Sequence, residues 1–488
     1  MQRTSRRSAF WIVASALVAG AGCTLAAGGV ETVVLEPGQN LQTIVARYPE
    51  GTRFRLEPGV YRAQTIYPKS RQKFIGQEGV VLSGAMELKT WTVVEAGLWG
   101  SERLPPPLSF HGVCADGRDL CKFQEDLFLN GRLYERVGSI EELGPGRWWY
   151  ADRRAYLAEE PAGQSVELGV TPLAFGGDAE DVLLKDLIVE KYASDAQEGA
   201  ISTDSGRDWR LVNVTARWNH GAGLSFGPET YVRGGSFSHN GQLGIRGAGG
   251  EGSQIQGVEI AFNNYAGYHP RWEAGGTKFW ETKGLIVRGS CVHHNAGPGL
   301  WTDYDNIDTV YEDNKVFLNA YEGIKHEISY EAIIRRNLVA RNGTSGVDHW
   351  LWQSQILIQN SGDVEVYSNR VETAGAFGNG IGVIHQDRGS GAYGPWESVN
   401  NSVHHNTIVH RRSRGYSGVV TDTGNEQYWR NANNSFDQNV YIVTDGTFDH
   451  WTFNDLRLYW DGIRELGHEK NGELIVERPA RTALSCDR

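Results

Sequence analysis

Two nine-residue stretches, NAGPGLWTD (residues 295–303) and NAYEGIKHE (residues 319–327), carry the pattern that decides the fold. In each, an asparagine, three further residues and a glycine precede an alternation of apolar and polar residues. Related copies surround Gly223, Gly244, Gly267 and Gly346, and the successive glycine spacings are 21, 23, 32, 24 and 23 residues. Such a period, with short strands and Asn/Gly turns, predicts the coils of a parallel β-solenoid.

A second motif, an alternation of apolar residues around an asparagine, lies between the glycines, as in residues 334–339 and 364–371. Alternation with a period of two predicts strands and not helices. Asparagine and glycine tolerate the left-handed backbone of solenoid corners, and stacked asparagines can hydrogen-bond from coil to coil. The longer spacings predict insertions of about 10–15 residues that form loops. Neither the leucine-rich-repeat signature nor the recurrent Trp-Asp of propeller blades occurs.

The N-terminus has the features of an export signal. Arg3, Arg6 and Arg7 precede an apolar stretch, residues 9–19, that is too short to span a bilayer comfortably. We therefore expect a secreted or periplasmic protein, and Cys23 raises the alternative of a lipoprotein anchor. No later stretch could span a membrane. In an exported protein, Cys114 and Cys121 are expected to form a small disulfide, whereas Cys291 is expected to be a small buried apolar residue.

The composition excludes several classes of partner. Lys plus Arg total 47 and Asp plus Glu total 59, so the net charge of −12 disfavours nucleic acid and anionic membranes as partners. The 61 glycines and 40% hydrophobic residues indicate many turns and many short strands, and not a disordered chain. No zinc spacing, phosphate loop or dinucleotide fingerprint is present, so we expect no cofactor, with Ca²⁺ as the open alternative. We expect a monomer.

The repeat resembles that of the pectate-lyase-like right-handed β-helix superfamily, above all in residues 301–306, 323–330 and 386–395. The resemblance covers most of residues 30–446 and implies an all-β, right-handed parallel β-helix with end caps. It implies a carbohydrate partner but no particular reaction, because the superfamily includes glycoside hydrolases, polysaccharide lyases, uronate epimerases and noncatalytic sugar binders.

The domain boundaries follow from where the repeat holds and where it is lost. We predict a signal peptide over residues 1–28, an N-terminal cap and first coils over 29–107, with a short helix over 41–47, and an inserted β-module over 108–166. The β-helix core is predicted over 167–446. A C-terminal cap, helical near residues 451–467, is predicted over 447–488.

Register predicts which side chains share the outer surface. The residue after each repeat glycine is apolar and points inward, so positions two and four beyond the glycine point outward. This places Trp301 and Asp303, Lys325 and Glu327, and Asp348 and Trp350 on neighbouring strands ~4.8 Å apart. Asp303 should lie beside Glu327, and Lys325 beside Asp348, with Trp301 and Trp350 at the border.

The first functional hypothesis is glycoside hydrolysis by paired carboxylates. Two adjacent carboxylates repel each other, so one pKa should rise, which separates a general acid from a nucleophile. We assign Glu327 as acid/base and Asp303 as the second carboxylate, and we include Asp348 and Lys325 in the catalytic group. The alternatives for the same residues are Ca²⁺ ligation and a solvated charged surface.

Two other hypotheses remain open. A uronate lyase or epimerase would use Lys325, His326, His349 or Tyr330, although the register turns both histidines inward. Residues 346–349 partly resemble an alginate-epimerase motif but lack its proline and its following glutamate. The third hypothesis is a noncatalytic carbohydrate-binding surface protein, which needs aromatic side chains along the face and no paired carboxylates.

Further side chains are candidates for substrate binding. Arg271 and Trp272 belong to the long 32-residue coil, and His385 and Asp387 open another loop. Such insertions form loops that can wall a binding site on a solenoid face. Together with Trp301, Trp350, His326 and His349, they complete the predicted substrate-binding set.

Overall fold

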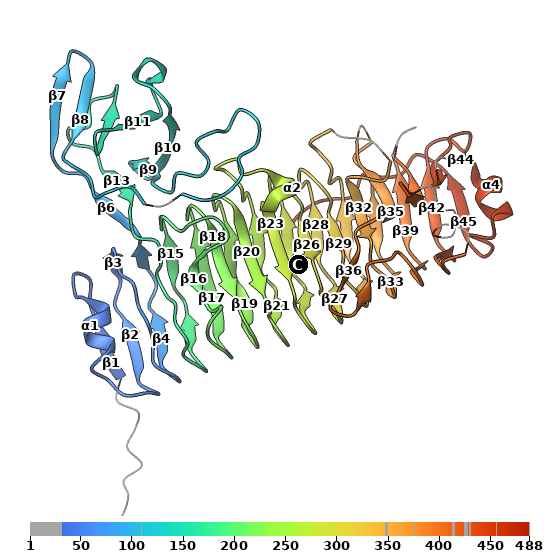
Figure 1. Cartoon of the computed structure of the whole chain (residues 1–488), viewed down its shortest axis with the longest axis horizontal. Helices are drawn as coiled ribbons and strands as arrows, with labels where there is room; N and C mark the ends of the chain where they lie inside the picture. Colours follow the sequence, from blue (N-terminus) through green and yellow to red (C-terminus); the bar gives the residue numbers. More distant parts are fainter. Residues whose placement is uncertain are drawn as a thin grey trace, which may run out of the picture. The chain divides into compact units, whose positions relative to one another are not determined.

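The computed structural model describes residues 32–108, 110–346, 350–375, 377–411, 415–423, 428, 431–454 and 456–487. Most of these residues wind into a parallel β-helix, in which each full coil contributes a strand to each of three ladders (Figure 1). The predicted export signal, including Cys23, lies outside the described residues. Among the residues described, no helix has the length and apolar composition needed to cross a membrane.

Ladders 1 and 2 form one 24-stranded sheet, and β17 and β19 run through both ladders. Ladder 1 consists of β1 (Thr32–Leu35), β2 (Arg53–Leu56), β4 (Lys73–Gly76), β14 (Leu183–Lys185), β17 (Arg210–Arg217), β19 (Tyr231–Ser238), β21 (Gln254–Gln256), β24 (Ile286–Arg288), β27 (Thr309–Glu312), β30 (Ala332–Arg335), β33 (Val364–Tyr367), β38 (Ser402–His404) and β41 (Ser435–Asp437). Besides β17 and β19, ladder 2 consists of β3 (Gly59–Arg62), β5 (Val80–Ser83), β15 (Ile188–Glu190), β22 (Glu259–Ala261), β25 (Cys291–His293), β28 (Lys315–Phe317), β31 (Leu338–Ala340), β34 (Arg370–Glu372), β39 (Thr407–His410), β42 (Val440–Val443) and β45 (Glu473–Val476).

Ladder 3 is the separate 11-stranded sheet that carries the predicted site. It consists of β16 (Gly199–Ser202), β18 (Ala222–Phe226), β20 (Leu243–Ala248), β23 (Gly275–Trp280), β26 (Leu300–Asp303), β29 (Ile324–Glu327), β32 (Ser354–Gln359), β35 (Asn379–His385), β40 (Ser417–Thr421), β43 (Trp451–Phe453) and β44 (Leu456–Leu458). All of its pairings between coils are parallel, and only the terminal pair β43–β44 is antiparallel.

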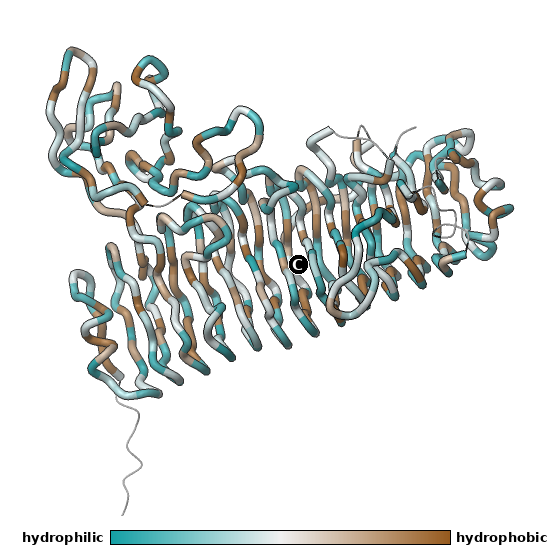
Figure 2. Tube along the Cα trace, viewed as in Figure 1, coloured by the Kyte–Doolittle hydropathy of each residue, from teal (hydrophilic) through white to brown (hydrophobic). Residues whose placement is uncertain are grey.

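The interior is filled by one contiguous apolar core that runs through the stacked coils. Figure 2 shows apolar and polar segments following one another along the coils, and strands such as β2 alternate exposed arginines with the buried Phe54 and Leu56. Leu224, Ile245, Leu300 and Ile324, the residues that follow four of the repeat glycines, are all fully buried. The predicted inward position is therefore confirmed for these coils.

Two coils depart from the predicted register. The ladder-3 strand after Gly244 begins at Gly275 and not at Gly267, and the one after Gly323 begins at Ser354 and not at Gly346. Gly267 and Gly346 both have φ of +87°, which places them in loop backbone. In both coils the insertion lies between the turn asparagine and the strand. Taking the next glycine in the sequence as the start of the strand therefore predicts a start that is too early.

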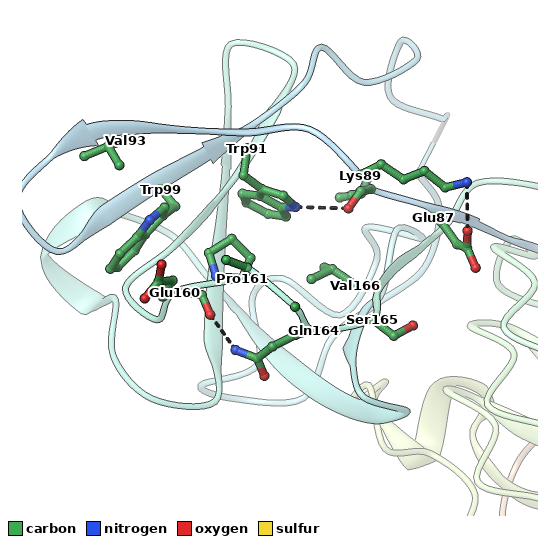
Figure 3. A pocket seen from close by; sticks show the side chains of 13 residues that line it. Glu87, Lys89, Trp91, Val93, Trp99, Glu160, Pro161, Gln164, Ser165 and Val166 are labelled. Carbon is green, nitrogen blue, oxygen red and sulfur yellow. Dashed lines mark hydrogen bonds and ion pairs between the residues drawn. The ribbon is translucent and has the colours of Figure 1, made fainter.

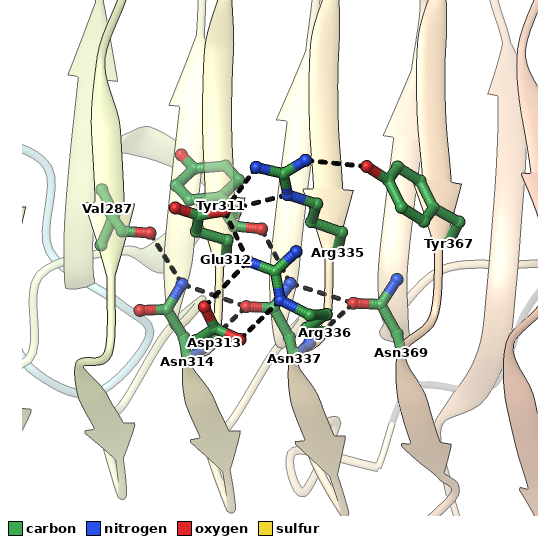
Figure 4. A network of polar contacts seen from close by, with 10 residues as sticks. All are labelled: Val287, Tyr311, Glu312, Asp313, Asn314, Arg335, Arg336, Asn337, Tyr367 and Asn369. Carbon is green, nitrogen blue, oxygen red and sulfur yellow. Dashed lines mark hydrogen bonds and ion pairs between the residues drawn. The ribbon is translucent and has the colours of Figure 1, made fainter.

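Buried asparagines at the corners form two hydrogen-bonded columns along the solenoid. In the first, Asn219, Asn240, Asn263, Asn295 and Asn319 each donate from the side-chain amide to the next asparagine, and Asn319 donates to Asn342 at 2.8 Å. The second runs through Asn314, Asn337, Asn369, Asn406 and Asn439, and Figure 4 shows its beginning. The coil-to-coil stacking of asparagine predicted from the repeat is thus confirmed.

An inserted module with its own apolar core interrupts the early coils. Its eight-stranded sheet consists of β6 (Ala85–Glu87), β7 (Trp91–Glu95), β8 (Leu98–Ser101), β9 (Leu127–Leu129), β10 (Arg132–Val137), β11 (Arg147–Ala151), β12 (Arg154–Leu157) and β13 (Val166–Gly169), with a 3₁₀ turn at Ile140–Glu142. Three of these strands, β6 to β8, lie before residue 108, where the sequence-based boundary was placed. A disulfide joins Cys114 to Cys121 in the connection between β8 and β9.

The two ends of the solenoid carry short helices. At the N-terminal end, α1 (Leu41–Val45) begins at Asn40, whose side chain accepts a hydrogen bond from the backbone N–H of Thr43. At the C-terminal end, α4 (Trp460–Glu465) lies within the range predicted for a helical cap. Two further short elements border the site described below, α2 (Pro270–Glu273) and the hairpin of β36 (Ser390–Gly391) and β37 (Gly394–Pro395).

The last described residues, 477–487, form a C-terminal strap that returns along ladder 2. Its backbone carbonyls accept hydrogen bonds from Arg411, then Arg341, then Lys315, side chains on successively earlier coils. The strap is anchored by a disulfide between Cys486 and Cys291. The expectation that Cys291 is a free apolar residue was therefore wrong, because its partner lies 195 residues away and could not be inferred from spacing.

The second asparagine column ends on a buried acid, and this generates a prediction about pH. Asn439 donates to Glu469, and burial is the main cause that raises the pKa of Glu469 from 4.5 to about 7. The folded protein therefore keeps a proton that the unfolded chain releases near pH 4.5. This contribution to stability is complete below pH 4.5 and is lost as the pH rises to about 7.

Glu469→Gln should remove this pH-dependent loss of unfolding free energy, which amounts to roughly 3 kcal/mol between pH 4.5 and about pH 7. The measurement is the thermal unfolding midpoint between pH 4 and pH 8 for the wild type and the variant. Glu465→Gln, an exposed change in the neighbouring helix, is the matched control. Identical pH profiles for the wild type and Glu469→Gln would contradict the prediction.

Candidate functional site

The candidate site lies on the outward side of ladder 3, where β26 and β29 pair. In this register Asp303 is the direct neighbour of Glu327, and Trp301 is the direct neighbour of Lys325. The inward-facing residues of the same strands, Leu300 and Ile324, belong to the core, so both carboxylates project outward. Adjacent strands lie ~4.8 Å apart, which brings the two acids side by side as the sequence predicted.

Glu327 is almost fully buried and is held by three donors. Lys325 Nζ lies 2.5 Å from its Oε2, and Arg388 contacts its Oε1 at 3.0 Å. Trp301 Nε1 donates to Oε2 at 3.1 Å. Burial alone would raise the pKa of Glu327, but Lys325 and Arg388 outweigh it and lower the pKa below its ordinary value. Glu327 is therefore the ionised member of the pair.

Asp303 has the opposite electrostatic environment. Burial, followed by the neighbouring charge of Glu327, raises its pKa. One of its oxygens, Oδ2, is 2.8 Å from Lys278 Nζ. The same Nζ lies 3.1 Å from Glu273 Oε1. The other oxygen, Oδ1, is buried and has no hydrogen-bond partner. The pKa values of the two adjacent carboxyl groups are thus shifted in opposite directions, because their cations are unequally distributed.

Trp301 is the centre of this cluster and not an exposed platform. Its indole ring lies between two ammonium groups, with Lys278 at 4.4 Å and Lys325 at 4.7 Å from the ring centroid. Only 3% of the residue is exposed. We name Glu273, Lys278, Trp301, Asp303, Lys325, Glu327 and Arg388 the charged cluster. Lys278 on β23 pairs with Asp303, Lys325 on β29 pairs with Glu327, and the two ammonium groups hold the Trp301 ring between them.

A row of polar side chains continues from the charged cluster along the same face. Five of them end in a buried atom that has no hydrogen-bond partner among the described residues, namely Asp204 Oδ1, Arg246 Nε, Trp280 Nε1, Asp303 Oδ1 and Gln359 Oε1. Arg246 lies over the ring of Trp280 and contacts Asp204 at 3.3 Å. Buried polar atoms in proteins almost always have partners, so this row suits a ligand rich in hydroxyl groups.

Sequence reasoning missed Lys278, Glu273, Asp204, Arg246 and Arg388 as members of the site. Arg246 and Lys278 occupy the same outward position as Trp301 in earlier coils of ladder 3. Arg246 could have been predicted from the sequence, because it lies two residues after Gly244, a position that points outward. Lys278 and Glu273 could not be found in this way, because the insertion before β23 shifts the register. Arg388 reaches the cluster from the loop between β35 and β36, and the repeat gives no position for that loop.

Several predicted site residues are placed differently by the structure. Asp348 and His349 lie outside the described residues. The ladder-3 neighbour of Lys325 is Leu357 on β32, so the predicted pairing of Lys325 with Asp348 along the strand was wrong. Trp350 precedes β32 in the loop and packs against an apolar cluster that includes Leu357, whereas Trp352 lies near Lys325, 5.9 Å from ring centroid to Nζ.

His326 belongs to the interior. It is fully buried, its Nδ1 lies 2.7 Å from Thr302 Oγ1, and its Nε2 lies 2.8 Å from the carbonyl of Tyr330. Burial lowers its pKa to about 4, so it is neutral near pH 7. The inward orientation expected from register is correct. The assignment of His326 as a substrate-binding residue is therefore wrong, because both ring nitrogens are occupied inside the solenoid.

The remaining candidates lie in the loops that border ladder 3. Arg271 and Trp272 are in α2, next to Glu273 of the charged cluster, and Trp272 packs on Tyr268 with 6.1 Å between ring centroids. His385 and Asp387 line a cleft of about 550 Å³ that also includes Arg388. The cleft adjoins the β36–β37 hairpin, which is tied to the earlier coil by hydrogen bonds from Ala392 and Trp396 to Asp305.

The cluster itself gives no support for a metal centre. Its carboxylates are bound by lysine and arginine, which compete with a cation for the same oxygens. Within the described ranges, the group of His, Cys, Asp and Glu ligand atoms close enough to share a metal is Cys291, His293 and Cys486. Its two cysteines form the disulfide of the C-terminal strap, so they are not free thiolate ligands.

Comparison with known proteins shows the fold. The family model described as "Right handed beta helix region" matches residues 199–361. A solved structure, the complex of XylC with xylose, aligns over 92% of this chain and 86% of its own, with a TM-score of 0.63 at 14% identity. The A-module of the Azotobacter vinelandii mannuronan C-5 epimerase AlgE4 covers 90% and 93% of the two chains, with a TM-score of 0.44 at 11% identity.

No curated protein matches the chain by sequence. The right-handed parallel β-helix that the resemblance implied is confirmed, since the family match and the XylC alignment both extend over its coils. At 14% identity the likeness concerns the fold, so the reaction has to be argued from the site.

The electrostatics of the pair predict unequal effects on stability. Glu327→Gln leaves Lys325 and Arg388 without a buried partner and should lower the free energy of unfolding by roughly 3 kcal/mol. Asp303→Asn leaves Lys278 paired with Glu273 and creates no buried charge without a partner, so the change should stay below about 1 kcal/mol. Urea unfolding at pH 7 measures both. Equal destabilisation by the two variants would contradict the charge distribution described here.

Proposed function

We propose that the protein is a glycoside hydrolase and that Asp303 and Glu327 are its two catalytic carboxyl groups. The observation that carries this proposal is the adjacency of two outward, buried carboxyl groups whose pKa values are shifted in opposite directions. A glycosidase needs one protonated and one ionised carboxyl group on either side of the scissile bond. The row of unpartnered polar atoms along the same face supports a hydroxyl-rich substrate.

The spacing of the pair favours retention of anomeric configuration. Retaining enzymes place their carboxyl groups about 5 Å apart, whereas inverting enzymes separate them by about 6.5–9.5 Å to admit a water molecule. Direct neighbours on adjacent parallel strands fit the shorter separation. In such a reaction one carboxylic acid protonates the leaving oxygen while the other carboxylate attacks the anomeric carbon, and the first group then activates water to release the sugar.

The pKa directions in the free protein favour Asp303 as the proton donor and Glu327 as the ionised partner, the reverse of the roles expected from the sequence. Asp303 Oδ1 is buried and makes no hydrogen bond among the described residues, so a substrate that reaches it would displace no existing partner. Both oxygens of Glu327 are occupied, and Arg388, which holds one of them, comes from a loop and is 36% exposed. A sugar that displaces Arg388 would free that oxygen for reaction.

The charge arrangement favours a neutral sugar over a uronate. Within the charged cluster, Lys278, Lys325 and Arg388 each contact a carboxylate, so their charges are already balanced. A lyase or epimerase requires a cation to neutralise the uronate carboxylate and a deprotonated base. Asp303 and Glu273 raise the pKa of Lys278 although burial opposes them, which keeps it protonated. Elimination or epimerisation of a uronate is therefore the weaker candidate.

Export of the protein is part of the same proposal. The two disulfides, Cys114–Cys121 and Cys291–Cys486, fit an oxidising compartment such as the periplasm or the extracellular medium. Extracellular polysaccharides and their oligosaccharides are available as substrates there.

Hydrolysis of a panel of aryl glycosides and soluble oligosaccharides tests the proposal. The panel includes xylosides, because the XylC structure that shares this fold contains xylose. On any substrate cleaved by the wild type, Asp303→Asn and Glu327→Gln should each lower kcat/KM by about 10²–10⁴-fold. The matched control is Glu312→Gln, which removes a carboxylate paired with Arg335 and Arg336 on ladder 1.

The same assay assigns the two roles. Within this range, the loss caused by removing the acid should become smaller as the leaving group improves, whereas the loss caused by removing the nucleophile should not depend on the leaving group. Full activity in both variants would refute the site. Absorbance from unsaturated uronates, produced by the wild type but not by the two variants, would replace hydrolysis with elimination.

A further inference from the structure

A second pocket lies in the inserted module. Its strands belong to the eight-stranded sheet of that module and not to ladder 3. It has a volume of about 700 Å³, and its walls come from the β7–β8 hairpin, the residues before β7 and the loop over residues 160–165. In Figure 3 the indole rings of Trp91 and Trp99 face the loop that carries Glu160, Pro161 and Gln164. A pocket of this size accommodates small ligands in proteins generally.

The two tryptophans are held in place by the module. Trp91 Nε1 donates to the carbonyl of Leu88 at 3.0 Å, and the ring packs against the core of the module. Trp99 lies on β8, paired on one side with β7 and on the other with β12. Both residues remain partly exposed. Ordered, partly exposed indoles provide flat apolar surfaces for ligand stacking with little loss of side-chain entropy on binding.

Polar groups surround these rings and are themselves pre-ordered. Gln164 donates to the carbonyl of Glu160 at 2.5 Å and accepts a hydrogen bond from Asn130 at 3.0 Å. The carboxylate of Glu160 is exposed, and Lys89 lies 3.3 Å from Glu87 at the rim. The pocket therefore combines aromatic surfaces with donors and acceptors at its edge. An apolar peptide would leave these polar groups unused, whereas a sugar ring has C–H faces and equatorial hydroxyl groups.

We propose that this pocket is a noncatalytic carbohydrate-binding site, in which Trp91 and Trp99 stack on sugar rings and Gln164 and Glu160 bind their hydroxyl groups. The site goes beyond the proposed hydrolase, since it would attach the protein to a polymer independently of the Asp303–Glu327 pair. Its ligand class is a neutral polysaccharide. Glu87 pairs with both Lys89 and Arg62, and the exposed Glu160 adds a negative charge, so the charges around the pocket do not favour an acidic polymer.

Retardation in native gels that contain xylan, hydroxyethyl cellulose or galactomannan tests the proposal with the full chain. The wild type should be retarded by at least one of the three polymers. Trp99→Ala should reduce the association constant at least tenfold, in line with the loss of one stacking ring. The double variant Glu160→Ala/Gln164→Ala alters exposed or half-exposed loop side chains and should weaken retardation without unfolding the module.

Trp149→Ala is the matched control, because Trp149 lies in the same sheet but stacks on Tyr156 and does not line the pocket. It should be retarded like the wild type. Near-UV circular dichroism confirms that each variant is folded. Absence of retardation of the wild type by all three polymers, or equal retardation of the wild type, Trp99→Ala and the double variant, would overturn the proposal, as would equal loss in Trp149→Ala.

The test separates this site from the proposed hydrolase. Asp303→Asn should be retarded like the wild type, and Trp99→Ala should hydrolyse small aryl glycosides at the wild-type rate. Loss of aryl-glycoside hydrolysis together with loss of polymer binding in Trp99→Ala would mean that the pocket is not an independent site. Failure of the hydrolase assays with retardation intact would refute only the catalytic proposal.

Discussion

The buried asparagine columns are the constraint on which the rest of this structure depends. Each side-chain amide donates both to the asparagine of the next coil and to a backbone carbonyl, as Asn295 does to Asn319 and to Ile260. A corner must leave the strand conformation, so its backbone groups would lose their partners in the interior without such side chains. Because the asparagine of each coil must lie opposite the asparagine of the next coil, the columns set the register of the strands between them.

That register brings Asp303 and Glu327 together across 24 residues of sequence. It also explains why insertions do not disturb the outward surface of ladder 3. The long coils add residues after Asn263 and Asn342, and the column continues past both, from Asn263 to Asn295 and from Asn342 to the side chain of Gln355. Gln355 occupies the place of the repeat glycine in its coil and completes the first column. The solenoid therefore tolerates loops over the face, where α2 and the β36–β37 hairpin now border the site.

The fold, the inward positions and the central carboxyl pair could be predicted because they follow from a local period. Leu300 and Ile324 point inward and Asp303 meets Glu327 for the same reason, namely the alternation of side chains along a strand of known register. The placement of Asp348 and Trp350 could not be predicted, since a glycine in a loop has the same appearance in sequence as a glycine that starts a strand. Contacts made by loops and ends, such as Arg388 with Glu327 and Cys486 with Cys291, depend on tertiary positions that no repeat encodes.

Two charged networks of the protein differ in how far water reaches their cations. On ladder 1, Arg335 and Arg336 bind Glu312 and Asp313, and the arginines are 31% and 45% exposed (Figure 4). There the carboxylates are bound by guanidinium groups that water also reaches, so the network costs little to maintain. On ladder 3, the cations Lys278 and Lys325 are only 11% and 12% exposed at the side chain, and an oxygen of Asp303 has no partner among the described residues. Burying two carboxyl groups side by side is unfavourable for folding alone. This arrangement, beside a row of polar atoms that lack partners among the described residues, is therefore not explained by folding stability alone.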